Sequence, residues 1–213
     1  MREYTKLNKE VYNSLATEYA KRLEHYSKMK DERATLDPFI ISLKKNFKKV
    51  RVLELGPGSG LDLKDLEKAG FETTAIDIAE NIINKAKKVA PKTKYLLGDF
   101  LEYNFGGYQF EGIFARGFIH LFPKNDAELV IEKIKNLLVQ NGIVFIGTTK
   151  DEKSEEGYFI KEDFPDKPKR FRKKWTEDEL EEFVTAAGFK ILKKYYHFEK
   201  NKKKKWMMFL LQK

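Results

Sequence analysis

The feature that most constrains this chain is an apolar segment that runs directly into a glycine-rich loop. Residues 50–55 are mostly apolar, and residues 56–60 read Gly-Pro-Gly-Ser-Gly. A mostly apolar run of this length is typical of a parallel strand that is covered on both faces. Alternating glycines let the backbone turn tightly and approach a ligand without an intervening side chain. We therefore predict a strand, a ligand-binding loop and a helix, in that order.

Strand and helix patterns alternate from this point onward. We predict strands at residues 50–55, 71–77, 93–97, 110–115 and 143–148, with helices between them. Such alternation implies a doubly wound parallel sheet. Two final strands, at residues 189–198 and 205–211, are joined by a polar segment that suits a hairpin. The predicted fold class is thus α/β, with a seven-stranded, mostly parallel sheet and a C-terminal antiparallel hairpin.

The N-terminal part is predicted to be helical. Tyr12, Ala16 and Tyr19 recur at spacings of four and three residues, which makes one apolar stripe along a helix. A second helix is expected to follow, with Asp37 as its N-cap and Pro38 at its first position. We expect one domain over residues 1–213, made of a helical cap (1–48), a ligand-binding core (49–149), a substrate-side insertion (150–175) and a C-terminal helix and hairpin (176–213).

Composition excludes several kinds of site. The chain has no cysteine, so a disulfide framework, a thiol nucleophile and a cysteine-based metal site are ruled out. Its three histidines lie far apart in the sequence, and we expect no metal ion. No apolar run approaches the ~20 residues of a membrane span, and no apolar secretory segment follows the N-terminus. We expect a soluble, cytoplasmic monomer or homodimer without a membrane partner.

The net charge of +9 leaves nucleic acid open as a partner. Many of the lysines, however, stand beside glutamate and aspartate at solvent positions of predicted helices, which is the stronger explanation of the charge. The cluster of basic and aromatic residues at 167–175 is where an RNA or an anionic substrate would bind. Nucleic acid is therefore an alternative partner that we do not favour.

Three kinds of ligand compete for the glycine loop. A phosphate-binding P-loop requires Gly-Lys-Ser/Thr, but Leu61 and Asp62 follow Gly60. A dinucleotide-binding loop requires Gly-x-Gly-x-x-Gly, and here Leu61 occupies the third glycine position. Asp62 would also lie where the pyrophosphate binds. Glu54, just before the glycines, suits a ligand end that carries a positive amine.

Residues 52–60, Val-Leu-Glu-Leu-Gly-Pro-Gly-Ser-Gly, resemble the first motif of class I S-adenosylmethionine-dependent methyltransferases of the small-molecule type. The resemblance is clear over residues 50–149 and looser on either side. It implies the Rossmann-like methyltransferase fold. It also implies that Glu54, Gly56, Gly58 and Gly60 hold the methionine part of S-adenosyl-L-methionine.

Two acids at later strand ends extend this resemblance. The Asp77 carboxylate can accept hydrogen bonds from both ribose hydroxyls, or it caps the following helix. The family places Ile78 or Ile82 against the adenine ring. It also has an acid at the position of Asp99 that accepts from the adenine amino group, with Phe100 packing nearby. An ordinary turn with a core phenylalanine is the alternative for Gly98-Asp99-Phe100.

Further residues are assigned by their place in this fold. Arg116 pairs with the methionine carboxylate or forms a surface ion pair. Tyr12 and Tyr19 resemble the aromatic residues that cover the cofactor in small-molecule members of the family, although plain helix packing explains them as well. His120 is a candidate general base, because the ordinary pKa of histidine lies near neutrality. A histidine without chemistry at a helix start is the alternative.

Together these features predict the transfer of a methyl group to an oxygen or nitrogen atom of a small-molecule acceptor. The methyl donor is already activated, so in-line positioning supplies most of the catalysis, with a base where the acceptor needs one. One alternative is an RNA or protein methyltransferase that uses residues 167–174. The fourth strand is not followed by Asn-Pro-Pro-Tyr or Asp-Pro-Pro-Tyr, which disfavours methylation of base amines. The second alternative is a cofactor-binding sensor or pseudoenzyme without turnover.

Overall fold

The computed structural model describes residues 1–27, 34–162, 164, 166–199 and 204–213, and every structural statement below concerns these residues. The strands of the main sheet are β1 (Arg51–Leu55), β2 (Glu72–Asp77), β3 (Lys94–Leu97), β4 (Phe110–Arg116), β5 (Leu138–Thr149), β8 (Lys190–Glu199) and β9 (Lys204–Gln212). The helices are α1 (Glu3–Ser27), α3 (Asp37–Asn46), α4 (Leu61–Lys68), α5 (Glu80–Val89), α6 (Lys124–Leu137) and α7 (Glu177–Ala186). Short 3-10 turns, η1 (Ala34–Leu36) and η2 (Ile119–Leu121), precede α3 and α6.

The seven strands form one sheet in the order β3-β2-β1-β4-β5-β9-β8. Strands β1 to β5 are parallel, β9 is antiparallel to β5, and β8 is antiparallel to β9. This arrangement confirms the predicted fold class, including the C-terminal hairpin. None of the described helices is long and apolar enough to cross a membrane.

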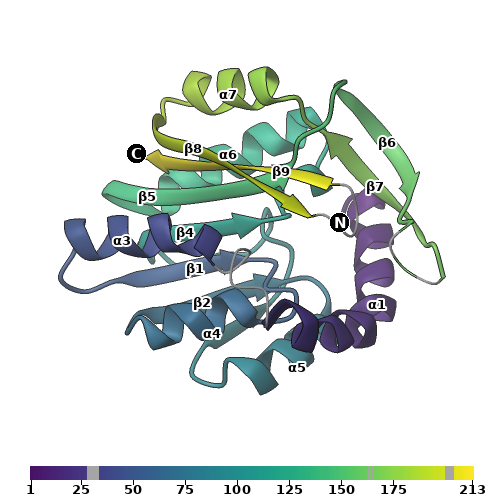
Figure 1. Cartoon of the computed structure of the whole chain (residues 1–213), viewed down its shortest axis with the longest axis horizontal. Helices are drawn as coiled ribbons and strands as arrows, with labels where there is room; N and C mark the ends of the chain where they lie inside the picture. Colours follow the sequence, from purple (N-terminus) through teal and green to yellow (C-terminus); the bar gives the residue numbers. More distant parts are fainter. Residues whose placement is uncertain (28–33, 163, 165, 200–203) are drawn as a thin grey trace.

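Helices cover both faces of the sheet (Figure 1). On one face, α3 and α4 bury Phe39 and Leu66, and on the other, α6 and α7 bury Ile134 and Leu180. The helix α1 stands apart from both layers, beside the edge at which the parallel strands end (Figure 1). A ligand at that edge would therefore lie between the strand ends and α1.

Helix α1 is fixed in place by polar contacts at its N-terminal half. The Asn8 side chain bonds to both backbone groups of Phe171: Oδ1 accepts from the amide at 3.0 Å, and Nδ2 donates to the carbonyl at 3.4 Å. The Tyr4 hydroxyl donates to Asp126 Oδ2 at 2.6 Å. These contacts tie α1 to the insertion and to α6, so the three segments form a common wall.

The insertion at 150–175 contains a hairpin that the sequence patterns do not predict. Strands β6 (Glu155–Ile160) and β7 (Lys169–Lys174) pair antiparallel, with Phe159 opposite Arg170. Pattern reading misses β7 because its buried positions include Arg170 and Lys173, which are 7% and 2% exposed. Alternation of apolar and polar residues cannot identify a strand that buries charged side chains.

Two local predictions were wrong. Asp37 does not cap α3: it is the first helical residue, and Leu36 of η1 leads directly into the helix without a side-chain cap. Strand β5 begins at Leu138, before the predicted start, and Asn141-Gly142 lies within it, with φ of 62° at Asn141. Helix α7, in contrast, has a side-chain cap, because Thr176 Oγ1 accepts from the Glu179 amide at 3.2 Å.

Candidate functional site

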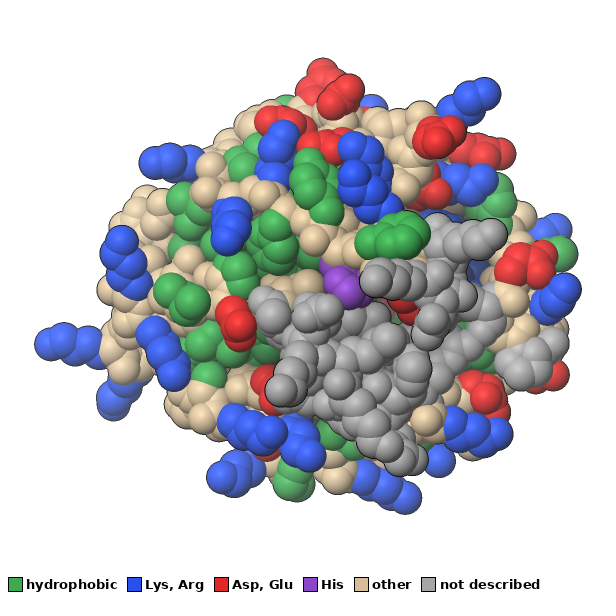
Figure 2. Space-filling model, in the orientation of Figure 1, with side chains coloured by type: hydrophobic (Ala, Val, Ile, Leu, Met, Phe, Trp, Pro, Cys, Tyr) green, Lys and Arg blue, Asp and Glu red, His purple; other side chains and the backbone are tan. Residues whose placement is uncertain are grey.

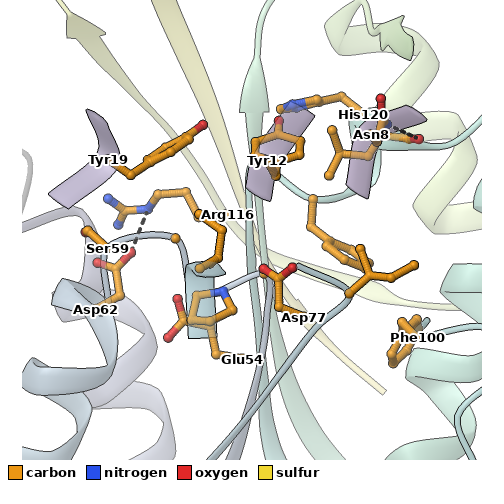
Figure 3. A pocket seen from close by; sticks show the side chains of 18 of the residues that line it. Asn8, Tyr12, Tyr19, Glu54, Ser59, Asp62, Asp77, Phe100, Arg116 and His120 are labelled. Atoms are coloured by element: carbon orange, nitrogen blue, oxygen red, sulfur yellow. Dashed lines mark hydrogen bonds and ion pairs between the residues drawn. The ribbon is translucent and has the colours of Figure 1, made fainter. Parts of the chain in front are cut away.

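A cavity of about 330 Å³ lies at the edge where β1, β2 and β4 end, and α1 covers it (Figure 3). Open α/β sheets bind their ligands at this edge. The cavity brings together all but one of the predicted site residues, namely Tyr12, Tyr19, Glu54, Gly56, Gly58, Asp77, Ile78, Ile82, Asp99, Phe100, Arg116 and His120. Gly60 is the exception.

The glycine loop folds in the left-handed backbone region that favours glycine. Gly56 has a φ of 71°, and a Cβ built on it would lie 3.3 Å from the Phe118 ring. Gly60 has a φ of 80°, is buried, and lies against the backbone of Ala86 in α5. Gly60 therefore supports the loop from behind, whereas Gly56 and Gly58 face the cavity.

Glu54 presents a buried carboxylate at the end of β1. The residue is 2% exposed, and its Oε2 atom has no hydrogen-bond partner among the described residues. Burial raises the pKa of this carboxyl well above its usual range, Asp62 raises it further, and Arg116 lowers it. A cationic group beside Glu54 would supply the missing partner and stabilise the ionised form.

Asp77 ends β2, the next strand in the sheet. Its Oδ1 accepts a hydrogen bond from the Ala79 amide at 2.7 Å. Helix α5 begins at Glu80, and no side chain caps it, so Asp77 shapes the turn before the helix. Burial raises the pKa of the Asp77 carboxyl to about 7, although the amides of Ala79 and Ile78 oppose the shift.

Asp99 follows β3, one strand farther along the same edge. Its Oδ1 accepts from the Leu101 amide at 2.9 Å, whereas its buried Oδ2 has no partner among the described residues. The neighbouring Phe100 is 3% exposed, and its ring packs edge-on against Phe118, with centroids 5.8 Å apart. The turn and the core phenylalanine of the alternative interpretation are therefore both present, and the second carboxylate oxygen of Asp99 remains available to a ligand.

Arg116 forms the ion pair that was one of its two suggested roles. Its Nε lies 3.5 Å from Asp62 Oδ2, and its Nη2 donates to Thr35 Oγ1 at 2.6 Å (Figure 3). The guanidinium thus has protein partners, yet the residue also lines the cavity. The ion pair is present, but it lies inside the site instead of on an open surface.

The two tyrosines of α1, Tyr12 and Tyr19, lie across the cavity from Glu54 and Asp77 (Figure 3). The rings of Tyr12 and Tyr19 are 6.0 Å apart, and Tyr19 also packs against Phe164 at 5.2 Å. Tyr12 and Tyr19 pack in addition against a cluster that contains Ala79 and Ile82. The predicted helix packing is therefore present, and it occurs at the cavity wall.

His120, in η2, is buried, with 6% of its surface exposed. Its Nδ1 lies 3.1 Å from Thr148 Oγ1, at the end of β5. Burial, followed by the charges of Arg170 and Arg172, holds the imidazole pKa well below its usual value. The ring is therefore neutral near pH 7, and a neutral imidazole has one nitrogen that can accept a proton.

Sequence reasoning missed the part of the cavity that the hairpins supply. Trp206 and His197 line it from β9 and β8, and Arg170 lines it from β7. In the sequence, Arg170 stands out only as part of a basic run. The inward direction of these side chains depends on strand register, which the pairing of distant segments sets.

Comparisons with known proteins agree with this geometry. Residues 52–142 match the family model described as a methyltransferase domain. The sequence matches no protein among the curated proteins. Among solved structures, similarity extends to the 1,6-didemethyltoxoflavin-N1-methyltransferase of Burkholderia thailandensis, which holds 1,6-didemethyltoxoflavin and S-adenosylhomocysteine. The TM-score is 0.68 at 19% identity, over 96% of this chain and 89% of that one.

Two further structures share the fold. The magnesium protoporphyrin IX methyltransferase of Synechocystis PCC 6803, with bound S-adenosylhomocysteine, matches with a TM-score of 0.72 at 14% identity, over 99% of this chain and 100% of that one. A (4+2)-cyclase, SpnF, matches with a TM-score of 0.64 at 13% identity, over 84% of this chain and 80% of that one. At such identities the likeness shows the fold, and proteins of more than one activity have that fold.

Proposed function

We propose that this chain, whose residues 52–142 match the methyltransferase-domain model, binds S-adenosyl-L-methionine and transfers its methyl group to an oxygen or nitrogen atom of a small molecule. The bound cofactor supplies an activated methyl group on a sulfonium centre. The protein must then bind both reactants, orient them in line and exclude water, which together can supply ~7–11 kcal/mol of the barrier.

One observation carries this proposal: three acids stand in a row along the sheet edge. Asp99, Asp77 and Glu54 follow or end β3, β2 and β1, which are consecutive neighbours in the sheet. Neighbouring strands lie ~4.8 Å apart, so the row spans roughly 10 Å. An adenine amino group, a ribose and a methionine amine occur in that order along the cofactor, and each donates hydrogen bonds to carboxylates.

The unpaired atoms support the same assignment. Glu54 Oε2 and Asp99 Oδ2 are buried without partners among the described residues, at the two ends of the row. An unsatisfied buried acceptor costs ~1–3 kcal/mol, and a donor from a ligand removes that cost. Ile78, Ile82 and Phe100 line the cavity beside Asp99 and Asp77, where a flat apolar ring would fit.

His120 would receive the proton of the methyl acceptor when that atom carries one. When Nδ1 donates to Thr148 Oγ1, Nε2 is the unprotonated nitrogen and can act as the base. The lowered pKa keeps the ring unprotonated at neutral pH, but it also makes His120 a weak base. It therefore suits an acceptor whose proton is acidic or leaves after the methyl transfer.

Nucleic-acid methylation is the less favoured alternative, because the basic segment 167–174 is largely used within the protein. Lys173 Nζ lies 2.9 Å from Glu179, Lys174 Nζ lies 2.7 Å from Glu155, and Arg172 is paired with Asp151. On the face in Figure 2, lysine and arginine side chains are scattered among acidic ones and form no continuous basic track over the described residues. Such a track is the usual electrostatic footprint of a nucleic-acid site.

Calorimetry separates the proposal from its competitors. We expect S-adenosylhomocysteine to bind, NAD not to bind, and Asp99→Asn to weaken S-adenosylhomocysteine binding by about 1–3 kcal/mol. Glu67→Gln, at an α4 residue that does not line the cavity, is the matched control and should bind normally. NAD binding in place of S-adenosylhomocysteine would refute the proposal. Binding without methylated product in a metabolite screen would instead favour a sensor.

A further inference from the structure

The acceptor end of the cavity, which we define as the part lined by His120, Lys161, Arg170, Arg172, Lys204 and Trp206, is rich in cations. His120 and Trp206 meet around Gly117, and a Cβ built on this glycine would lie 3.6 Å and 3.7 Å from their rings. The four cations all lower the pKa of His120, although burial lowers it most. All four cations therefore lie close enough to His120 for their charges to act on its ring.

Arg170 differs from the other cations in its surroundings. It is 7% exposed, and its Nη1 atom has no hydrogen-bond partner among the described residues. Arg172, in contrast, forms an ion pair with Asp151 at 2.7 Å. The Arg170 guanidinium lies over the Tyr12 ring, whose centroid is 6.0 Å from Cζ. A cation–π contact of this length leaves the Nη1 donor without an acceptor.

The backbone that carries Arg170 is held firmly. Arg170 pairs with Phe159 in the β6–β7 hairpin, and the Asn8 side chain bonds to the next residue, Phe171, on both its amide and its carbonyl. Side chains two apart on a strand share a face, so Arg170 and Arg172 both line the cavity. The guanidinium is thus presented from a fixed position, as a binding group requires.

A buried guanidinium nitrogen without an acceptor is costly, because desolvation of a charged group exceeds that of a neutral polar group. An oxyanion fits the planar fork of donors better than any other partner. We propose that Arg170 binds a carboxylate or phosphate group of the methyl acceptor, so that the substrate is a small anionic molecule. This inference rests on the proposed methyltransferase function and names its substrate class.

The rest of the acceptor end suits the remainder of such a molecule. Trp206, Phe118 and Phe122 line the cavity together with Tyr12, and they offer apolar and aromatic surface. Arginine at one side and aromatic rings around it favour an acceptor with an apolar body and one oxyanion. His120 lies in the same part of the cavity, close enough to Arg170 for the guanidinium charge to act on its ring. An acceptor bound by Arg170 would therefore lie near the candidate base.

The test uses three ring compounds of similar shape with the protein saturated by S-adenosylhomocysteine: benzoate, phenyl phosphate and the neutral benzamide. We expect one or both anions to bind at least tenfold more tightly than benzamide, and the comparison between them distinguishes a carboxylate from a phosphate site. Arg170→Gln should weaken anion binding at least tenfold and leave benzamide binding unchanged. Arg170→Lys should fall between the two, since lysine keeps the charge but loses the planar fork.

Lys169→Gln is the matched control, because it removes the same charge from the neighbouring, exposed position of β7 outside the cavity lining. It should leave anion binding unchanged. Unchanged S-adenosylhomocysteine affinity in Arg170→Gln shows that this variant is folded, and if it does not fold, Arg170→Lys with the same ligands decides.

Three outcomes overturn the inference. Neither anion binds the saturated protein more tightly than benzamide, or Arg170→Gln retains full anion affinity, or this variant loses S-adenosylhomocysteine affinity by the same factor. The last result would assign Arg170 to the carboxylate of the cofactor. Failure of the wild-type protein to bind S-adenosylhomocysteine is a different result, which removes the proposed function itself.

Discussion

Arg116 forms an ion pair with Asp62, with Nε 3.5 Å from Oδ2, at the start of the helix that follows the glycine loop. Both charges act on Glu54. Burial is the main cause of the raised pKa of Glu54, Asp62 adds to it, and Arg116 opposes it. The charges of the ion pair therefore influence how readily Glu54 ionises.

We predict that Arg116→Gln weakens S-adenosylhomocysteine binding near neutral pH, because removal of the guanidinium raises the pKa of Glu54 further. Each unit of such a shift costs about 1.4 kcal/mol, or tenfold in affinity, while Glu54 is protonated in the free protein. Calorimetry between pH 6 and 8 should show the deficit shrinking as the pH rises. Asp62→Asn is the control of opposite sign and should lower the pKa of Glu54. A deficit of constant size across this range would indicate direct contact between Arg116 and the ligand carboxylate.

Asp77 gives a second pH-dependent prediction, on proton release. Its carboxyl titrates at a pKa of about 7 in the free protein because it is buried. Two ribose hydroxyls that donate to the carboxylate would favour the ionised form and lower this pKa. Binding of S-adenosylhomocysteine near pH 6.5 should therefore release protons, and its affinity should rise with pH up to about 7.5.

Calorimetry in buffers of different ionisation enthalpy measures this release. Asp77→Asn keeps an oxygen for the Ala79 amide but cannot titrate, so it should release fewer protons and bind more weakly by about 1–3 kcal/mol. Proton release equal to that of the wild type would show that another group, such as Glu54, is responsible.

The pKa of His120 predicts how stability depends on pH. Its folded-state pKa lies well below the ordinary 6.5, so the unfolded chain binds more protons between those two values. This group therefore lowers the free energy of unfolding as the pH falls through 6.5, and its contribution stops changing below the folded-state pKa. Urea titrations at pH 7.5 and 5.5 should show a smaller loss for His120→Gln than for the wild type. Equal losses would mean that the pKa of His120 is the same in the folded protein as in the unfolded chain.

The sequence was sufficient to predict that Glu54, Asp77 and Asp99 lie side by side, because each of these acids occurs where a parallel strand ends. Once Glu54, Asp77 and Asp99 are assigned to three consecutive strand ends, the parallel topology brings them to one edge. Hydrophobic patterns identified β1 and β2 because most of their buried positions are apolar, and β3 because three of its four residues are apolar or aromatic. The same reasoning could not identify Arg170, since it is a buried charge on a strand.

The orientation of the C-terminal hairpin lay beyond local patterns for a different reason. Trp206 faces the cavity because β9 pairs with β5 in one register, with Trp206 opposite Thr149. A slip of one residue would turn it to the opposite face. Only the contacts of the folded sheet select between these registers, so a single sequence indicates the hairpin without showing which of its residues enter the site.

Gly60 carries the last prediction, which concerns stability. A Cβ at Gly60 would lie 3.0 Å from both the Cα and the carbonyl oxygen of Ala86, at a φ of 80°. Gly60→Ala should therefore incur about 1–2 kcal/mol from the left-handed backbone and a further ~1–3 kcal/mol from overpacking against α5.

Gly70→Ala is the matched control for this change. Gly70 has a φ of 87°, and no described atom lies within 4 Å of where its Cβ would stand, so it should show the backbone cost alone. Urea unfolding of the ligand-free proteins measures both free energies, with the slope checked for two-state behaviour. If Gly60→Ala is no less stable than Gly70→Ala, α5 must move away from the loop at little cost, and the close contact between Gly60 and Ala86 does not fix the position of the glycine loop.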